Sequence, residues 1–222
     1  MLSEISFKFE KMFLKNELQT IISGVGNVTK GSAIQAVSDY LRKSKAAGKN
    51  VEEEELVKEQ ETKALIEYSN KNSFFIQRPA EDRFLAEGAE QKVYLEDSNE
   101  FVIKFNDSIF YRTWQDYFNN LLLHNYFFPP TYYELIGFLY ESKKLYAAVR
   151  QPYIIANETT NEDFVKEVMT NNGFINKKNS DYYSKELGII VEDLHDENVL
   201  TNKSVLFFID TVFYLTKEFN ES

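Results

Sequence analysis

Two apolar runs near the end of the sequence each lead into an aspartate, and this arrangement constrains the chain more than any other feature. The first run, residues 187–191, precedes Asp193, and the second, residues 205–209, precedes Asp210. Asn198 lies five residues after Asp193. Phosphoryl transfer from a magnesium nucleotide needs this set, because one carboxylate orients and deprotonates the attacking hydroxyl while an Asn and a second Asp hold the metal. The spacing therefore predicts one chemical unit.

The order of these residues resembles that of a known fold. Asp193, His195 and Asn198 form the motif D-x-H-x-x-N, which is followed roughly a dozen residues later by Ile-Asp. This resembles the catalytic loop and metal-binding aspartate of the protein-kinase-like fold, with His195 in place of the usual lysine, as in antibiotic and small-molecule phosphotransferases. A longer resemblance covers about residues 81–215, through the segments EGAEQKVYL, FVIKFN, LLLHNYFFP, YELIGF, RQPYI and FFIDTVF. It is to the kinase-like domain of polyvalent proteins of phages and mobile elements, and of related bacterial proteins.

The resemblance implies an α+β chain with a minimal two-lobed protein-kinase-like fold, made of a small antiparallel-sheet N-terminal lobe and a reduced C-terminal lobe. We expect residues 1–78 to form a helical N-terminal extension, residues 79–155 the N-terminal lobe and hinge, and residues 156–222 the C-terminal lobe. Twelve residues follow Asp210. We therefore expect neither an activation segment nor the helical platform on which protein kinases hold a peptide.

The hydrophobic pattern agrees with that division. Apolar residues at helical spacing predict helices over residues 3–22, 32–48 and 51–72. Alternation then predicts two β-hairpins, over 84–106 and 133–153, the first with Val93, Leu95, Val102 and Ile103 as its apolar positions. Between the hairpins we expect a helix capped by Ser108 and ended by the two prolines at 129–130. His124 lies within this helix among aromatic residues, which favours a core or capping role.

The resemblance places the phosphates of a nucleotide under the first hairpin. Gly88 would form the lid, with the backbone amides of Ala89 and Glu90 near the phosphates, and Lys104 would contact them from the next strand. In protein kinases a helix glutamate pairs with this lysine, and the corresponding helix here contains only Asp116. Asp116 could pair with Lys104 at shorter reach, or it could face solvent and leave the lysine without that partner.

The adenine ring would lie at the hinge, in the segment RQPYI. Backbone groups near Gln151 and Tyr153 are the candidates for reading its edge, because such rings are commonly held by main-chain donors and acceptors in an apolar slot. The implied cofactors are ATP and Mg²⁺. Asp193 would orient the acceptor hydroxyl, His195 could steady the loop or the phosphate, and the metal would be held by Asn198 and Asp210.

Composition narrows the class of protein further. The formal net charge is −10, and it splits into +4 over residues 1–50 (eight basic, four acidic) and −14 over residues 51–222 (17 basic, 31 acidic). An acidic main part argues against nucleic-acid binding, which needs clustered Lys and Arg. The chain has no Cys and no apolar run of the roughly 18 residues that span a bilayer. We therefore expect a cytoplasmic protein, with a possible protein partner for the N-terminal helices.

Three functions follow as alternatives. The first is an ATP- and Mg²⁺-dependent phosphotransferase with an unknown acceptor, either a protein or a small molecule. The second is a nucleotide-binding pseudokinase or regulatory module with little or no transfer, which the single-glycine lid and the missing helix glutamate favour. The third is a scaffold that docks through its N-terminal helices. The joint presence of Lys104, Asp193, Asn198 and Asp210 favours the first.

Overall fold

Five antiparallel strands build the sheet of the first lobe. The structure, a computed structural model, describes residues 2–47, 54–89 and 91–221. The strands run in the order β1-β2-β3-β5-β4, with β1 at Phe84–Glu87, β2 at Gln91–Leu95, β3 at Phe101–Asn106, β4 at Glu134–Glu141 and β5 at Lys144–Pro152. Ser142 and Lys143 have φ of 52° and 66°, the conformation of the two-residue turns that hairpins favour. Both expected hairpins are confirmed.

The most buried side chains of the first hairpin differ from those expected. Tyr94 and Phe105 are 1% and 2% exposed, and they pack with Ala148 on one face of the sheet. Val93 and Leu95, expected on the buried face, are only half-buried. Of the four apolar positions expected in this hairpin, only Val102 is buried, at 6% exposed; Ile103 is half-buried as well.

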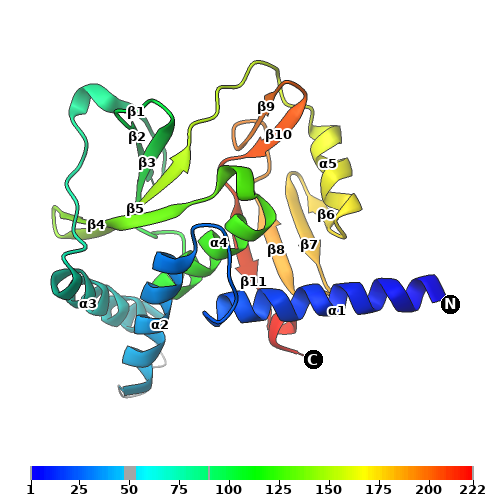
Figure 1. Cartoon of the computed structure of the whole chain (residues 1–222), viewed down its shortest axis with the longest axis horizontal. Coiled ribbons are helices and arrows are strands. Elements are labelled where there is room, and N and C mark those ends of the chain that lie inside the picture. Colours follow the sequence, from blue (N-terminus) through cyan, green and yellow to red (C-terminus); the bar gives the residue numbers. More distant parts are fainter. Residues whose placement is uncertain (1, 48–53, 90, 222) are drawn as a thin grey trace.

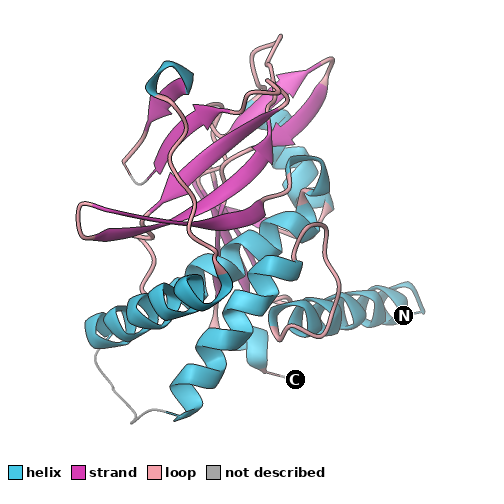
Figure 2. Cartoon of the chain, turned by 60° about the vertical axis from the view of Figure 1, so that its left-hand side comes forward, coloured by secondary structure: helices cyan, strands magenta, loops and turns pink. Residues whose placement is uncertain are grey.

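Helices cover the other face of this sheet. Helices α2 (Ser32–Ala47), α3 (Glu54–Asn72) and α4 (Trp114–Phe127) lie together below the sheet in Figure 2. Their apolar side chains share one buried cluster with β4 and β5, which includes Ile34, Leu65, Phe118, Phe138 and Val149. The expected end of the second helix at Gly48 and the first residues of the third helix lie outside the described residues. The N-terminal helices thus share a core with the first lobe.

Helix α4 begins later than expected. Its N-cap is Thr113, whose side chain accepts a hydrogen bond from Asp116 N, so the expected cap at Ser108 is wrong. Ser108 has φ +56°, a left-handed conformation that interrupts a helix. Glu61 of α3 is buried, and its Oε2 accepts a hydrogen bond of 2.6 Å from Trp114 N. A carboxylate at this end is favoured by the helix dipole.

The second lobe contains two further antiparallel sheets and one helix. A four-stranded sheet runs β11-β8-β7-β6, and a hairpin joins β9 to β10. Their bounds are β6 Ile175–Lys178, β7 Asp181–Ser184, β8 Ile189–Glu192, β9 Val199–Asn202, β10 Val205–Phe208 and β11 Val212–Leu215. Helix α5 (Glu162–Asn171) is capped by Asn161. Short 3₁₀ turns complete the chain at η1 (Glu81–Arg83), η2 (Pro129–Thr131) and η3 (Lys217–Asn220).

Helix α1 (Leu2–Ile22) runs along the base of the molecule (Figure 1). Lys15 Nζ donates to the carbonyl oxygens of Glu218 and Glu221, at 2.6 Å each. Gln19 Nε2 donates to Phe219 O. Leu18 belongs to the buried cluster of the second lobe. This helix therefore holds the C-terminal turn η3 against that lobe.

The fold is mixed α+β with antiparallel sheets, as expected for a small kinase-like protein. Within the described ranges 2–47, 54–89 and 91–221, no helix combines the length and the apolar character needed to cross a membrane. Helix α4 lies between the large sheet and the strands of the second lobe (Figure 1). It contacts β11 and η2 as well as α2, and it is placed to connect the two lobes.

Candidate active site

A cleft of about 660 Å³ lies between the first hairpin and the loops of the second lobe. Its lining includes most of the residues that the sequence predicted for the site: Gly88, Ala89, Asp193, His195, Asn198 and Asp210. Lys104, Gln151 and Tyr153 are not among the residues that line it. Asp116 does not line it either. The structure therefore brings the predicted lid, catalytic motif and metal motif together, and it places these four predicted residues outside the lining of the cleft.

Asp193 is the first residue after β8, and its backbone is held in an unusual conformation. Its φ is +71°, which non-glycine residues adopt at a cost, most often at functional sites. Its N–H donates to Asp181 Oδ1 at 3.2 Å, and the next amide, Leu194 N, donates to Ser180 O at 3.1 Å. The turn between β6 and β7 thus fixes the start of the motif and turns the Asp193 side chain toward the cleft.

His195 connects the members of the motif. Its Nδ1 accepts a hydrogen bond from Glu197 N at 3.3 Å, so in the neutral ring the hydrogen is on Nε2. Nε2 lies 3.4 Å from Asp193 Oδ1 and 3.2 Å from Asn198 Nδ2. The hydrogen on Nε2 can therefore be donated to the Asp193 carboxylate, whereas Asn198 Nδ2 is itself a donor and makes no hydrogen bond to it in this tautomer. The ring thus lies where it can steady the predicted catalytic carboxylate.

Asn198 and Asp210 are adjacent because the backbone joins their segments. Asn198 O accepts hydrogen bonds from Ile209 N at 2.9 Å and from Asp210 N at 3.4 Å. The side-chain nitrogen of Asn198 donates to Asp193 O at 3.0 Å, which leaves the amide oxygen as its free ligand atom. One carboxylate and one amide oxygen suit Mg²⁺, which prefers oxygen ligands and completes its shell with phosphates and water.

No cluster of three or more His, Cys, Asp or Glu that could hold a metal occurs among the described residues. A magnesium site formed by the oxygen atoms of Asn198 and Asp210 stays a prediction.

Lys104, on strand β3, contacts the segment that contains Asp210. Its Nζ donates to Ile209 O at 2.9 Å and lies 4.0 Å from Asp210 Oδ2. The side chain is 6% exposed, and the ring of Tyr133 lies 5.5 Å from Nζ. The positive charge is thus next to the predicted metal ligand, although the side chain does not line the open cleft.

The predicted lid contacts the metal motif through a residue that sequence reasoning missed. Gly88 N donates to Gln91 O at 2.8 Å, which closes the turn of the lid, and Glu90 lies outside the described residues. Gln91 Nε2 donates to Asp210 Oδ2. A Cβ atom added at Gly88 would meet only Gln91 O, at 3.9 Å. The turn therefore does not require glycine at this position. The small size of Gly88 would matter only when a ligand is present.

The hinge residues have other partners. Gln151 is 1% exposed, and its Nε2 donates to Thr131 O at 2.8 Å. Tyr153 N donates to Glu100 O at 2.8 Å, so this amide is already used and would need to be released before it could bind an adenine edge. Reading of adenine near Gln151 and Tyr153 stays a prediction, and the carbonyl groups are the better candidates.

Asp116 lies in the first turn of α4, where its Oδ2 is 3.8 Å from Arg112 Nε. Its charge also acts on Lys58, although burial is the larger effect and lowers the pKa of that ammonium group. The contacts of Lys104 described above involve Asp210, so they favour Asp210 over Asp116 as its carboxylate neighbour. A pairing of Lys104 with Asp116 stays a prediction.

Three acidic residues of the cleft were not predicted. Asp181, Glu192 and Glu197 all line it, and Glu192 lies immediately before Asp193. Burial, followed by the nearby charges of Asp181 and Asp193, raises the pKa of the Glu192 carboxyl above its usual value. The position of Glu192 next to the motif was a usable signal in the sequence. Asp181 had none, because its contact depends on how β7 packs beside β8.

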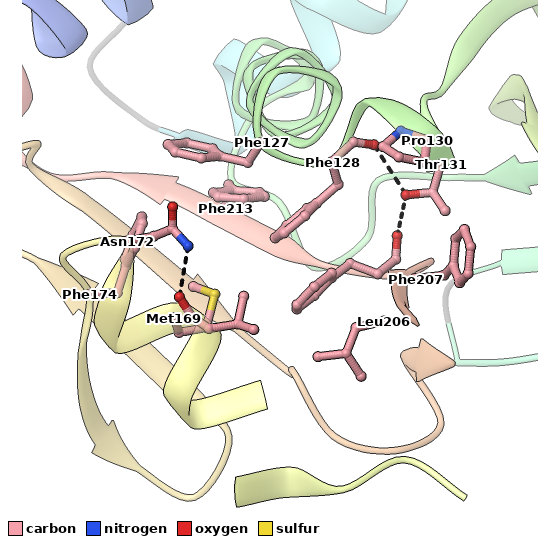
Figure 3. A pocket seen from close by; sticks show the side chains of 12 residues that line it. Phe127, Phe128, Pro130, Thr131, Met169, Asn172, Phe174, Leu206, Phe207 and Phe213 are labelled. Atoms are coloured by element: carbon pink, nitrogen blue, oxygen red, sulfur yellow. Dashed lines mark hydrogen bonds between the residues drawn. The ribbon is translucent and has the colours of Figure 1, made fainter. Parts of the chain in front are cut away.

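A second pocket lies behind the Asp210 segment (Figure 3). It has a volume of about 250 Å³ and is lined mainly by aromatic rings, including Phe127, Phe128, Phe208 and Phe213. The rings of Phe128 and Phe208 are stacked with centroids 4.0 Å apart. No charged side chain is among the residues that line this pocket, whereas the predicted carboxylates line the 660 Å³ cleft.

Comparison with known proteins gives one match. The sequence model of a family described as "Serine/Threonine/Tyrosine Kinase found in polyvalent proteins" matches residues 58–217. This range begins within α3 and ends in η3, so it contains every residue of the cleft. No curated protein matches the chain. No solved structure matches it either.

Proposed function

The chain belongs to the family of serine/threonine/tyrosine kinases found in polyvalent proteins, and from that premise we propose that it is a phosphotransferase that uses ATP and Mg²⁺ in the 660 Å³ cleft. The observation that carries the proposal is the shared lining of the cleft by the lid, Asp193, Asn198 and Asp210. These are the groups that phosphoryl transfer from a magnesium nucleotide requires. Because the family is described by the residues serine, threonine and tyrosine, protein hydroxyls are the first acceptors to test.

In the proposed reaction Asp193 accepts the proton of the acceptor hydroxyl as its oxygen attacks the γ-phosphorus. The new P–O bond forms while the bond to the β-phosphate oxygen breaks, and ADP leaves. His195 holds the Asp193 carboxylate toward the acceptor, through the 3.4 Å approach of Nε2 to Oδ1. Mg²⁺, when bound by Asn198 and Asp210, would neutralise charge on the phosphates.

Lys104 and the lid supply the remaining positive groups in this proposal. Lys104 Nζ lies 4.0 Å from Asp210 Oδ2, so a phosphate beside the metal would be within reach of its ammonium group. Gly88 and Ala89 line the same cleft on the lid side, and their backbone can approach a phosphate closely because glycine carries no side chain. The Asp210 carboxylate would exchange its hydrogen bond from Gln91 for a bond to the metal.

Nucleotide binding without transfer is the second candidate. The hydrogen bond from Gln91 Nε2 to Asp210 Oδ2 favours it, because this bond occupies the carboxylate that transfer would need for the metal. The two candidates differ in what Asp193 does. In a module that only binds nucleotide, Asp193 has no chemical role and its replacement leaves every property of binding unchanged.

The test is a thermal-shift titration with ATP plus Mg²⁺, with Mg²⁺ alone and with ATP plus chelator. A ligand that binds only the folded state raises the melting temperature by an amount that grows with its concentration relative to its Kd. We expect a Mg²⁺-dependent rise in the wild type, its loss in Asp210→Asn and its retention in Asp193→Asn. Asp97→Asn, on a fully exposed side chain of the β2–β3 turn, is the control for removing one charge.

Transfer is then measured with labelled ATP and a pool of Ser/Thr/Tyr peptides, including autophosphorylation. The phosphotransferase proposal expects label transfer by the wild type and by Asp97→Asn, and at least about a hundredfold less by Asp193→Asn, the lower end of what a general base contributes. Equal transfer by the wild type and Asp193→Asn would refute the role of Asp193. A Mg²⁺-dependent thermal shift without any transfer would favour the second candidate.

A further inference from the structure

Helix α4 is hydrogen-bonded directly to the residues that follow Asp210. His124 Nδ1 lies 2.7 Å from Thr211 Oγ1, and Asn120 Oδ1 accepts a hydrogen bond of 2.8 Å from Phe213 N. Asn120 and His124 are four residues apart, so they lie on the same face of the helix. His124, Thr211 and Asn120 are 0%, 1% and 4% exposed. These bonds therefore form inside the protein, out of contact with water.

The residues that precede Asp210 are held from the same direction. Thr131, in the turn that ends α4, donates from Oγ1 to Phe208 O at 2.6 Å, and the dashed lines at Thr131 in Figure 3 mark its bonds. The hydroxyl of Tyr133 donates to Ile209 O at 2.8 Å. Residues 208–213 are thus fastened on both sides of Asp210 by buried polar groups from α4, η2 and the chain just before β4.

The direction of each bond at His124 follows from its partners. Thr131 O can only accept, and it lies 2.8 Å from His124 Nε2, so Nε2 carries the hydrogen of the neutral ring. Nδ1 is then an acceptor, and the Thr211 hydroxyl must donate to it. Thr131 O also accepts from Gln151 Nε2. One carbonyl group thus links α4, the end of β5 and, through His124, the residue beside Asp210.

We propose that His124 and Thr211 form a positioning pair that keeps the Asp210 segment fixed on helix α4. In protein kinases an ion pair between a strand lysine and a helix glutamate brings this helix into register with the active site. Here α4 is tied to the metal segment itself by neutral hydrogen bonds. The consequence for metal binding rests on the proposed function, whereas the fastening of residues 208–213 does not.

Thr211→Val tests the pair, because it removes the hydroxyl donor and keeps the shape of the side chain. Thr211→Ser keeps the hydroxyl and is the rescue variant. Thr201→Val is the matched control: Thr201 is also buried at 6% exposed, and its hydroxyl is 2.9 Å from that of Thr160, in the β9–β10 hairpin and away from α4. Replacement of His124 itself is less informative, since loss of a fully buried ring can prevent folding.

The first measurement is hydrogen exchange without any ligand, followed by mass spectrometry of peptides that cover residues 210–216, outside strand β10, which pairs with Thr201. We expect faster exchange of these peptides in Thr211→Val than in the wild type, with Thr211→Ser close to the wild type. Thr201→Val should leave them unchanged, even if it lowers the overall stability by a similar amount. Unchanged exchange in Thr211→Val, or equal acceleration in Thr201→Val, would overturn the proposal.

The second measurement is the Mg²⁺ concentration that gives half of the ATP-dependent thermal shift. Residues that orient metal ligands from behind typically change metal affinity by about 10- to 100-fold when replaced. We expect Thr211→Val to need at least about tenfold more Mg²⁺, with Thr211→Ser restoring the wild-type value. A wild type without any Mg²⁺-dependent shift refutes the proposed nucleotide site, and hydrogen exchange then decides on the positioning pair alone.

Discussion

His124 makes the stability of this protein sensitive to acid, and this can be measured without knowing the substrate. The ring is completely buried, and desolvation lowers its pKa from 6.5 to about 3; the hydrogen bond to Thr131 opposes this shift and the charge of Lys104 adds to it. In the unfolded chain the same ring has the ordinary value near 6.5. Between these two pH values the unfolded state binds a proton that the folded state does not.

The sign and size of the effect follow from linkage. A pKa that is lower in the folded state means that stability is fully present above pH 6.5 and is lost as the pH falls toward 3. The slope approaches about 1.4 kcal/mol per pH unit between the two values. From pH 7 to pH 4.5 the loss from His124 alone is about 2.5 kcal/mol, a large part of the total stability of an ordinary domain.

The assay is urea unfolding at pH 7 and pH 4.5, for the wild type and for His124→Gln, which keeps a polar side chain at this position. Carboxylates also titrate in this range, and Glu96, whose pKa is lowered mainly by its hydrogen bond to Arg150, adds its own acid sensitivity. Because both proteins share these groups, the difference between them isolates His124. We expect the wild type to lose about 2.5 kcal/mol more than the variant.

An equal loss of stability in both proteins would refute the reasoning. If His124→Gln does not fold, ring NMR of the wild type gives the same decision. We expect the His124 ring signals to stay at their neutral positions from pH 7.5 down to pH 4.5, as long as the protein is folded. Titration of that ring near pH 6 in the folded protein would show that it is not held neutral by burial.

Three further results are expected. Gly88→Ala should leave the melting temperature of the free protein unchanged, since the added Cβ atom meets only Gln91 O at 3.9 Å, and should weaken the ATP-dependent thermal shift; an unchanged shift would remove the lid from the site. Glu61→Ala should cost about 2 kcal/mol in urea unfolding, because it leaves the buried Trp114 N–H without its acceptor, and Glu61→Gln, which keeps an acceptor oxygen, should cost less. Tyr133→Phe should cost about 1 kcal/mol by the loss of one hydrogen bond, and a neutral result in unfolding would show that the bond contributes nothing.

Four of the predicted site residues that line the cleft, Asp193, His195, Asn198 and Asp210, lie close together along the chain. Asp193, His195 and Asn198 are in one loop, and apolar strands on each side of it determine where they point. The short apolar run before Asp210 was enough to predict that Asp210 lies beside them, because the β9–β10 hairpin brings the chain back to this loop within a few residues. The antiparallel sheet of the first lobe was predictable for the same reason, because hairpins pair residues that are near in sequence.

Contacts between distant segments were not predictable in this way. Gln91 and Asp210 are 119 residues apart, and nothing local in either segment indicates that an amide would reach that carboxylate. The start of α4 was misplaced because Ser108 is a good capping residue by type. Its left-handed backbone and the Glu61 carboxylate, supplied from α3, decide where the helix begins.

Strand β11 starts only two residues after Asp210, and its first pair joins Val212 to Glu192, the neighbour of Asp193. The two aspartates therefore leave the same end of adjacent strands, and the spacing of one β-ladder, about 5 Å, sets how far apart their backbones can be. A regulatory switch that orders a flexible segment would need such a segment between Asp210 and strand β11, and only Thr211 lies there.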